Sequence, residues 1–227
     1  PCGVAWVDGQ GPEAQLEALH LAWAGDPVSA FGGVLVFTEP LELATARWLS
    51  DRFVELVAAP KLHEVHSAPA LEILRAKRKK LKALPVFRFH LLPGEEEREA
   101  GVSVPGGELF QTLDLDLSDE FRSVTRAPWP EEKTLLARFG VAVCRTLKSN
   151  SIAIVREIRG AQRAFQLVGA GQGQPNRVDA LQVLAVPRAR RVLQAGGGLS
   201  ECIMVSDAFF PFRDTVDVAR DCGIRFI

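Results

Sequence analysis

Residues 131–155, EEKTLLARFGVAVCRTLKSNSIAIV, contain the change of hydrophobic period that decides the fold class. Over residues 131–145 apolar side chains recur at helical spacing, whereas residues 152–155 form a short uninterrupted apolar run typical of a buried strand. A helix followed closely by a buried strand predicts an α/β protein. The helix is expected to pack through Leu135, Phe139 and Val143.

The same alternation continues toward the C-terminus. Residues 179–193 have helical spacing and residues 203–205 form a short apolar run, so we expect a helix and then a strand. A further helix is expected from Asp214, because an oxygen at this position can cap a helix and Asp217 follows three residues later. Residues 223–227 have the composition of a strand.

Toward the N-terminus the alternation is present but less regular. Residues 13–23 have helical spacing, and residues 25–27, Gly-Asp-Pro, are expected to end that helix. Residues 32–37, rich in Val, Leu and Phe, predict a buried strand, and residues 41–56 return to helical spacing. Residues 93–107 are polar with Gly and Pro at both ends, which indicates a loop in the first half or a linker between halves.

Composition and charge exclude several classes of protein. The 227-residue chain is 47% hydrophobic, enough for one large core or two smaller ones. Its formal net charge of -1 gives no field that would attract nucleic acid or an anionic membrane. A basic run at residues 75–82 is interpreted as a solvated helix face, with a nucleic-acid patch as the alternative. Its members are Arg75, Lys77, Arg78, Lys79, Lys80 and Lys82.

Cysteine usage and chain ends give two further expectations. The four cysteines lie far apart without a C-x-x-C pair, which fits a reducing cytoplasm. No apolar run approaches the roughly 20 residues that span a bilayer. Because the chain begins at Pro1 and stops within an expected strand, we expect it to be part of a longer protein.

Three loops place reactive or ligand-binding residues at the ends of expected strands, where open α/β sheets bind ligands. Residues 26–33, DPVSAFGG, allow close approach of a ligand to the backbone, although a tight turn explains them equally well. Residues 148–151, KSNS, and 169–177, GAGQGQPNR, place Arg177 before a helix, where a phosphate would meet a guanidinium and helix N–H groups. The alternative there is a Gly-rich turn with a solvated arginine.

The third loop is residues 206–214, SDAFFPFRD, with three phenylalanines around a proline. They suit an apolar wall for a flat ring, or Phe212 could instead staple the following helix. A dinucleotide motif is excluded, because Gln174 occupies its third glycine position. The zinc-deaminase and G-x-S-x-G patterns are absent from the sequence, and we predict no catalytic metal.

Four motifs together identify a resemblance to a known family. They are GDPVSAFGG at residues 25–33, KSNS at 148–151, GAGQ at 169–172 with Arg177, and SDAFFPF at 206–212. In this order they resemble the 5-aminoimidazole-4-carboxamide ribonucleotide (AICAR) formyltransferases, over essentially the whole chain. In that family the enzyme is usually the C-terminal part of a bifunctional protein that begins with inosine monophosphate cyclohydrolase, and nothing in this chain resembles the cyclohydrolase part.

The resemblance implies a fold, an assembly and a reaction. The expected class is α/β, with two cytidine-deaminase-like α/β/α subdomains with mixed sheets and no zinc, over residues 1–117 and 118–227. It implies a cytoplasmic homodimer with active sites at the subunit interface. The implied reaction transfers a formyl group from the co-substrate 10-formyltetrahydrofolate to the 5-amino group of AICAR in purine biosynthesis.

The resemblance also implies site residues. Asn150 is placed near the reacting groups and could supply a hydrogen-bond donor for the developing oxyanion, as could Lys148. The amine of AICAR is a poor nucleophile because its lone pair is delocalised, so the site must orient it and remove a proton. The substrate-binding residues implied are Phe31, Gly32, Glu55 and Arg177. The folate-side residues implied are Phe209, Pro211, Phe212 and Asp214.

Two segments expected from the resemblance have no counterpart in this sequence. They are a Lys-His pair, which comes shortly before the Pro-Cys-Gly found here at residues 1–3, and an Arg-x-Phe-x-His segment that closes the domain. The four histidines match neither: His20, His63, His66 and His90. We therefore expect this chain to bind weakly and catalyse nothing, and a full-length parent to be active. The alternatives are a non-catalytic AICAR-binding, folate-binding or dimer-scaffold relative, and a zinc deaminase relative.

Overall fold

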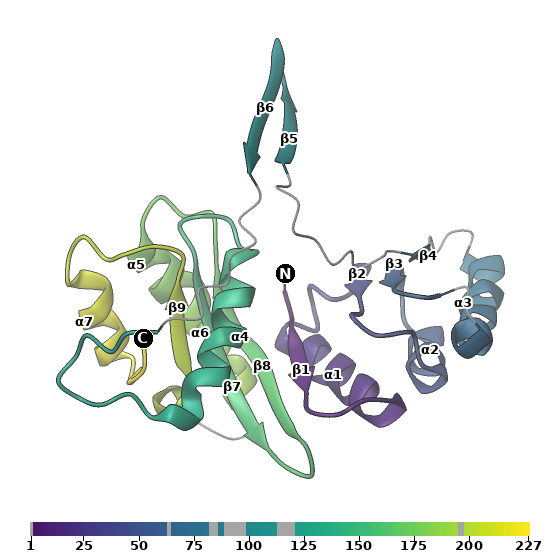
Figure 1. The fold of residues 1–227 in the computed structure, drawn as a ribbon, viewed down its shortest axis with the longest axis horizontal. Helices are drawn as coiled ribbons and strands as arrows, with labels where there is room; N and C mark the ends of the chain where they lie inside the picture. Colours follow the sequence, from purple (N-terminus) through teal and green to yellow (C-terminus); the bar gives the residue numbers. More distant parts are fainter. Residues whose placement is uncertain (1, 63–64, 82–85, 89–98, 113–120, 195–197) are drawn as a thin grey trace.

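The computed structural model describes residues 2–62, 65–81, 86–88, 99–112, 121–194 and 198–227 (Figure 1). Helices alternate with strands of parallel and antiparallel sheets, which confirms the α/β class. The elements are β1 (Ala5–Val7), α1 (Pro12–Gly25), β2 (Gly33–Val36), α2 (Leu43–Ser50), β3 (Val54–Ala59), η1 (Val65–Ser67), α3 (Ala68–Leu81), β4 (Val86–Arg88), β5 (Glu99–Val104), β6 (Gly107–Thr112), η2 (Glu131–Lys133), α4 (Thr134–Arg145), β7 (Ile152–Arg159), β8 (Arg163–Gly171), α5 (Arg177–Asp179), η3 (Ala180–Ala185), α6 (Val186–Leu193), η4 (Leu199–Glu201), β9 (Ile203–Ser206) and α7 (Asp214–Asp221).

A four-stranded antiparallel sheet, in the order β1-β8-β7-β9, forms the centre of one layered unit. Successive residues of β7 point to opposite faces of the sheet. Ile152 and Ile154 pack against η3, α6 and α7, while Ala153 and Val155 pack against α4. Both faces are therefore covered, and the strands expected at residues 152–155 and 203–205 are confirmed.

A three-stranded parallel sheet, in the order β2-β3-β4, forms the centre of the other unit. α1, α2 and α3 contribute Leu19, Leu49 and Leu74 to the core that covers one face. On edge strand β2, Val34 and Val36 point the other way and are 61% and 65% exposed. The expectation of a buried strand at residues 32–37 is therefore correct for the strand and wrong for its burial.

The helix expected over residues 41–56 is wrong in its second half. α2 ends at Ser50, whose hydroxyl donates to the Arg47 carbonyl oxygen (2.6 Å), and β3 begins at Val54. Short apolar runs fit either a buried helix or a buried strand, so spacing alone could not separate the two.

A β-hairpin of β5 and β6 occupies residues 99–112 and stands clear of both units in Figure 1. The loop expected over residues 93–107 is therefore wrong for residues 99–104. Residues 93–98 lie outside the described part of the chain. The Gly and Pro residues that indicated a loop include Pro105 and Gly106, which form the hairpin turn.

Helix α4 confirms the helix expected at residues 131–145, preceded by the short turn η2, but its buried face is shifted. Leu135 is 49% exposed, whereas the neighbouring Leu136 is fully buried. Phe139 is partly buried and Val143 buried, so two of the three expected packing positions contact the core.

The helix expected at residues 179–193 is confirmed as the continuous run α5, η3 and α6, of which η3 is π-helical. The side chain of Asn176 begins this run, because its Oδ1 accepts a hydrogen bond from the Asp179 N–H (2.8 Å). Arg177 is thereby fixed in the first turn.

The two units are joined by strand pairing as well as by the covalent chain. β1 pairs antiparallel with β8, so a strand near the N-terminus completes the four-stranded sheet. Residues 117 and 118, where a subdomain boundary is expected, lie outside the described residues. Near the other end of the chain, Phe226 forms a single parallel bridge with Ile203, so residues 223–227 begin a strand pairing as expected. None of the described helices is long and apolar enough to cross a membrane.

Candidate active site

Three strand ends meet at one edge of the four-stranded sheet. Ile152, the first residue of β7, lies opposite Gly171 at the end of β8 and opposite Ser206 at the end of β9. This follows from the antiparallel pairing, which places the start of one strand beside the ends of its neighbours. Two of the three loops expected to bind ligands are therefore brought together here.

Asn150 is held by the segment that follows β8. Its Nδ2 donates to the carbonyl oxygens of Gln174 (3.1 Å) and Pro175 (3.0 Å), and its backbone N–H donates to the Gln174 carbonyl (3.3 Å). Because both acceptors are carbonyl oxygens, the atom of the Asn150 amide that faces them must be the nitrogen. Both amide hydrogens are thus used within the protein, and Oδ1 is the side-chain atom left to meet a ligand.

Lys148 lies at the exposed rim of the same edge and is fixed through its backbone. Its N–H donates to Oε1 of Gln172 (3.2 Å), and its carbonyl oxygen accepts from the Gly173 N–H (2.8 Å). The side chain, by contrast, has no hydrogen-bond or ion-pair partner among the described residues. The ammonium group is therefore free to reach a bound molecule.

Arg177 is anchored from β9. Its Nε donates to the Ser206 hydroxyl (3.2 Å), and its Nη2 lies 3.4 Å from Oδ1 of Asp207. The Ser206 hydroxyl in turn donates to the Ala208 carbonyl oxygen (2.9 Å). The guanidinium keeps further N–H groups for an anion, and its orientation is set by two neighbours.

Asp207 joins the segments of this edge and is a residue that the sequence analysis did not assign to the site. Its Oδ1 accepts from the Ser151 N–H (3.2 Å), and its own N–H donates to the Ser151 carbonyl oxygen (3.4 Å). Burial raises its pKa, but hydrogen bonds from the Ser149 hydroxyl and the Ser151 N–H, with the charge of Arg177, hold the pKa below its usual value. The sequence signal at this residue is its place in the motif SDAFFPF, but the partners that define its role are distant along the chain.

The Gly-rich stretch 169–177 is only partly a loop. Gly169 and Gly171 lie within β8, where a Cβ on Gly171 would lie 1.9 Å from the carbonyl oxygen of Ala180, and one on Gly169 would lie 2.2 Å from that of Ala185. The expectation of a loop at these two glycines is therefore wrong. Because these two glycines have no side chain, η3 can pack directly on β8.

The loop after β9 carries the apolar residues expected to face a flat ring. Phe209 and Phe212 are 79% and 72% exposed, and Pro211 is exposed beside them. Phe210, by contrast, packs against the buried core of the sheet. The loop thus presents two of its three aromatic rings to solvent.

Asp214 is the first residue of α7 rather than its N-cap. Arg213 occupies the capping position and makes no side-chain capping bond. The Asp217 carboxylate accepts hydrogen bonds from the Arg213 guanidinium (2.7 Å and 2.9 Å) and not from a backbone N–H at the start of the helix. The expected cap is wrong because this exposed Arg213 pairs with the carboxylate one helical turn away.

The first expected loop lies on the parallel-sheet unit. Gly32 has a φ of 69°, its N–H donates to the Phe53 carbonyl oxygen (3.1 Å), and a Cβ at this position would lie 3.2 Å from the Phe53 ring and 3.7 Å from Oε1 of Glu55. Asp26 closes the loop by accepting hydrogen bonds from the Ser29 hydroxyl (2.7 Å) and N–H (3.1 Å). Phe31 is 71% exposed. These contacts account for a tight turn and leave Phe31 and Glu55 open to solvent.

The expected site residues therefore fall into two groups. Asn150, Lys148 and Arg177 share the edge from which the loop 207–213 also leaves, whereas Phe31, Gly32 and Glu55 lie around β2 and β3. Among the described residues, no hydrogen bond or ion pair joins the two groups. In Figure 1 β2 and β3 lie in the right-hand unit, and β7 and β9 in the left-hand unit.

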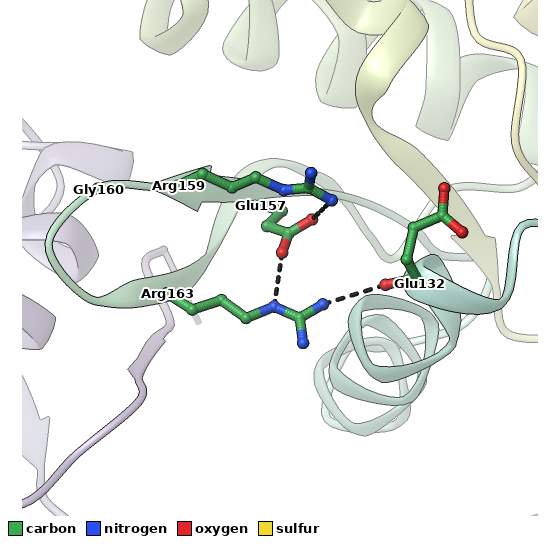
Figure 2. Close-up of a pocket in the computed structure, with 5 residues that line it drawn as sticks. All are labelled: Glu132, Glu157, Arg159, Gly160 and Arg163. Carbon is green, nitrogen blue, oxygen red and sulfur yellow. Dashed lines mark hydrogen bonds and ion pairs between the residues drawn. The ribbon is translucent and has the colours of Figure 1, made fainter.

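A shallow cavity of about 370 Å³ lies at the opposite end of β7 and β8. Figure 2 shows Arg159 and Arg163 on either side of the Glu157 carboxylate, which is bound by both guanidinium groups. Burial raises the pKa of Glu157, but these hydrogen bonds and charges hold it below its usual value. The opposite charges in this cavity neutralise one another, and none of the expected site residues lines it.

Within the described ranges, no group of three or more His, Cys, Asp or Glu side chains could hold a metal ion. His63, Glu64 and His90 lie outside these ranges.

Comparison with known proteins adds a finding independent of the geometry. The sequence model of the family described as "AICARFT/IMPCHase bienzyme" matches residues 1–188. "Bifunctional purine biosynthesis protein PurH" of Acidithiobacillus ferrooxidans is 37% identical over 233 aligned residues, which cover 100% of this chain and 40% of that protein. Proteins of the same name from Clostridium botulinum and Prochlorococcus marinus are 36% and 34% identical, over 100% of this chain and 39% of each. The chain thus spans about two fifths of the length of these relatives.

Proposed function

Because the chain belongs to the AICARFT/IMPCHase bienzyme family, we propose that it contributes the formyltransferase site of a purine-biosynthesis enzyme. The reaction transfers the formyl group of 10-formyltetrahydrofolate to the 5-amino group of AICAR. The amine nitrogen forms a bond to the formyl carbon, and the bond from that carbon to N10 of the folate breaks. The amine loses one proton and N10 gains one. The products are formyl-AICAR and tetrahydrofolate.

Arg177 is proposed to bind the phosphate of AICAR. It stands in the first turn of the helical run α5–η3–α6, where helix N–H groups also favour an anion. Its contacts to Ser206 and Asp207 fix the guanidinium before substrate arrives, which lowers the entropy cost of binding. Phe31, Gly32 and Glu55 are proposed to complete the nucleotide pocket.

Asn150 and Lys148 are proposed to act at the reacting atoms. Since the amide hydrogens of Asn150 are already bound to Gln174 and Pro175, its Oδ1 is the atom that would accept a hydrogen bond from the amine and orient its lone pair. The donor to the formyl oxygen, as it becomes an oxyanion, would then be the free ammonium of Lys148.

The loop that follows β9 is proposed to form the folate-side wall. Exposed Phe209, Pro211 and Phe212 offer apolar surface to a flat pterin ring, and Asp214 offers a carboxylate to its ring nitrogens. The co-substrate would therefore approach from β9, next to Asn150. No metal is required by this chemistry.

The proposed assembly is a cytoplasmic homodimer of chains with two cytidine-deaminase-like subdomains, residues 1–117 and 118–227. Within the described ranges no hydrogen bond or ion pair joins the two groups of site residues, which supports a site shared between subunits. The four cysteines are free thiols, which supports a reducing compartment.

The activity is proposed for the full-length gene product. The Lys-His pair and the Arg-x-Phe-x-His segment of the family, the presumed sources of a general base and a further cation, have no match in the 227 residues. We therefore expect these residues alone to bind AICAR weakly and to transfer no formyl group.

One observation carries the proposal: Asn150, Arg177 and the loop 207–213 converge at one sheet edge in a chain of this family. The test is formyl transfer by the full-length product, followed as tetrahydrofolate formation from AICAR and 10-formyltetrahydrofolate. Asn150→Ala is expected to lower kcat about 100-fold, since it removes the group that orients the amine.

The matched control is Gln10→Ala, which removes an exposed amide side chain between β1 and α1 and is expected to leave kcat unchanged. A full-length product that binds AICAR or folate without transferring the formyl group would instead support the non-catalytic binding or scaffold function.

A further inference from the structure

We propose that Asp207 is a positioning residue of the proposed active site, whose carboxylate orients Arg177 and the turn that carries Asn150. This inference rests on the proposed function and adds a residue to it. Asp207 touches neither proposed substrate; it acts through the two groups that do.

The contact to the Asn150 turn is made at Ser151, the residue that follows Asn150. Oδ1 of Asp207 accepts from the Ser151 N–H (3.2 Å). The backbone N–H of Asp207 returns a hydrogen bond to the Ser151 carbonyl oxygen (3.4 Å). Ser151 itself is fully buried. The turn is therefore tied to the residue after β9 by two hydrogen bonds immediately after Asn150.

The contact to Arg177 uses the same carboxylate oxygen. Nη2 of Arg177 lies 3.4 Å from Oδ1 of Asp207, and the two side chains are only 16% and 15% exposed. An ion pair shielded to this degree is screened less by solvent than one on the open surface. Removal of the carboxylate would leave a guanidinium with one fixed neighbour, Ser206, and freedom to turn away from the substrate phosphate.

One carboxylate thus links the phosphate-binding side of the site to the reacting side. The two links can be separated by substitution, because an amide at this position keeps an oxygen acceptor for the Ser151 N–H but loses the charge that faces Arg177. A residue that merely stabilised the sheet edge would affect the amount of folded protein and not one kinetic constant selectively.

The experiment compares Asp207→Asn and Asp207→Ala in the full-length gene product, with AICAR concentration varied. Asp207→Asn is expected to raise KM for AICAR about tenfold and to change kcat less than about threefold, because only the phosphate contact is loosened. Asp207→Ala is expected to raise KM similarly and also to lower kcat about 100-fold, because the Asn150 turn is released as well.

The control is Glu157→Gln, which removes a carboxylate bound by two arginines at the opposite end of β7 and β8 and is expected to leave both constants unchanged. If Asp207→Ala does not fold, Asp207→Asn still tests the inference, since its side-chain oxygen can still accept the hydrogen bond from the Ser151 N–H.

Kinetic constants of Asp207→Asn equal to those of the wild-type protein would overturn this inference and leave the proposed function standing. The same holds if both variants lose activity only in proportion to their loss of folded protein, measured by circular dichroism. A wild-type product that neither binds AICAR nor transfers a formyl group would overturn the proposed function itself, and the positioning role with it.

Discussion

Gly171 is a residue whose role depends on the fold and not on its local sequence. Its lack of a side chain serves the contact between β8 and η3, where the Ala180 carbonyl oxygen occupies the space of a Cβ. A glycine that admits a ligand and a glycine that admits a helix look identical in sequence. Asp207 is a second case: it lies in the motif SDAFFPF, but its hydrogen-bond and ion-pair partners are supplied only by the fold.

Gly171→Ala is expected to destabilise the protein by about 3 kcal/mol, because the added methyl group would lie 1.9 Å from a backbone atom and strand and helix would have to separate. Urea unfolding followed by circular dichroism measures the change. Gly107→Ala is the matched control: a Cβ there meets nothing within 4 Å, and the change should stay within about 1 kcal/mol. Equal stabilities of the two variants would refute the close packing of η3 on β8.

At the scale of elements, the sequence predicts the helix α4 correctly but assigns one wrong residue to its buried face. Residues 134–145 include so many apolar side chains that more than one face of the helix could be the apolar one. Contact with Ala153 and Val155 of β7 selects Leu136 and Val143 and leaves Leu135 half exposed. The sheet, and not the helix, determines which stripe is buried.

Leu136→Ala is therefore expected to cost about 3 kcal/mol of unfolding free energy, through lost burial and the cavity left behind. Leu135→Ala, one residue earlier on the same helix, is expected to cost less than about 1 kcal/mol, because its side chain is already 49% exposed. Thermal or denaturant unfolding of the two variants gives the comparison. A larger loss for Leu135→Ala would mean that α4 faces the sheet as the spacing alone predicted.

At the scale of the whole molecule, the proposed site residues lie on two units of the chain. The group at Asn150 and Arg177 lies on the antiparallel sheet, and the group at Gly32 and Glu55 lies on the parallel sheet. A symmetric dimer can bring one group from each subunit together twice, since a two-fold axis makes every contact in duplicate. The proposed homodimer is such an arrangement.

Mixing full-length Asn150→Ala and Glu55→Ala proteins, each inactive alone, is expected to restore about a quarter of wild-type activity. If subunits exchange freely, half of the dimers contain one of each, and one of their two shared sites has both native residues. The assay is formyl transfer after mixing under conditions that allow exchange. Activity that stays at the level of the separate variants would place both groups in one subunit.

The amino-acid sequence by itself determined the α/β class, the core strands at residues 152–155 and 203–205, and the helices that flank them, because hydrophobic period is a local property. It also carried the family, whose motifs are local runs of residues. It did not separate α2 from β3 or detect the hairpin of β5 and β6, because short apolar runs and Gly-Pro turns fit more than one local structure.

Only the tertiary structure decided which residues meet. The antiparallel order of β7, β8 and β9 brings Asn150, Arg177 and Asp207 to one edge, although they are far apart in the chain. Packing of η3 on β8 decided the role of the glycines, and the sheet decided the face of α4. These are properties of contacts between distant segments, and spacing along the chain does not encode them because register and strand order are set when the core closes.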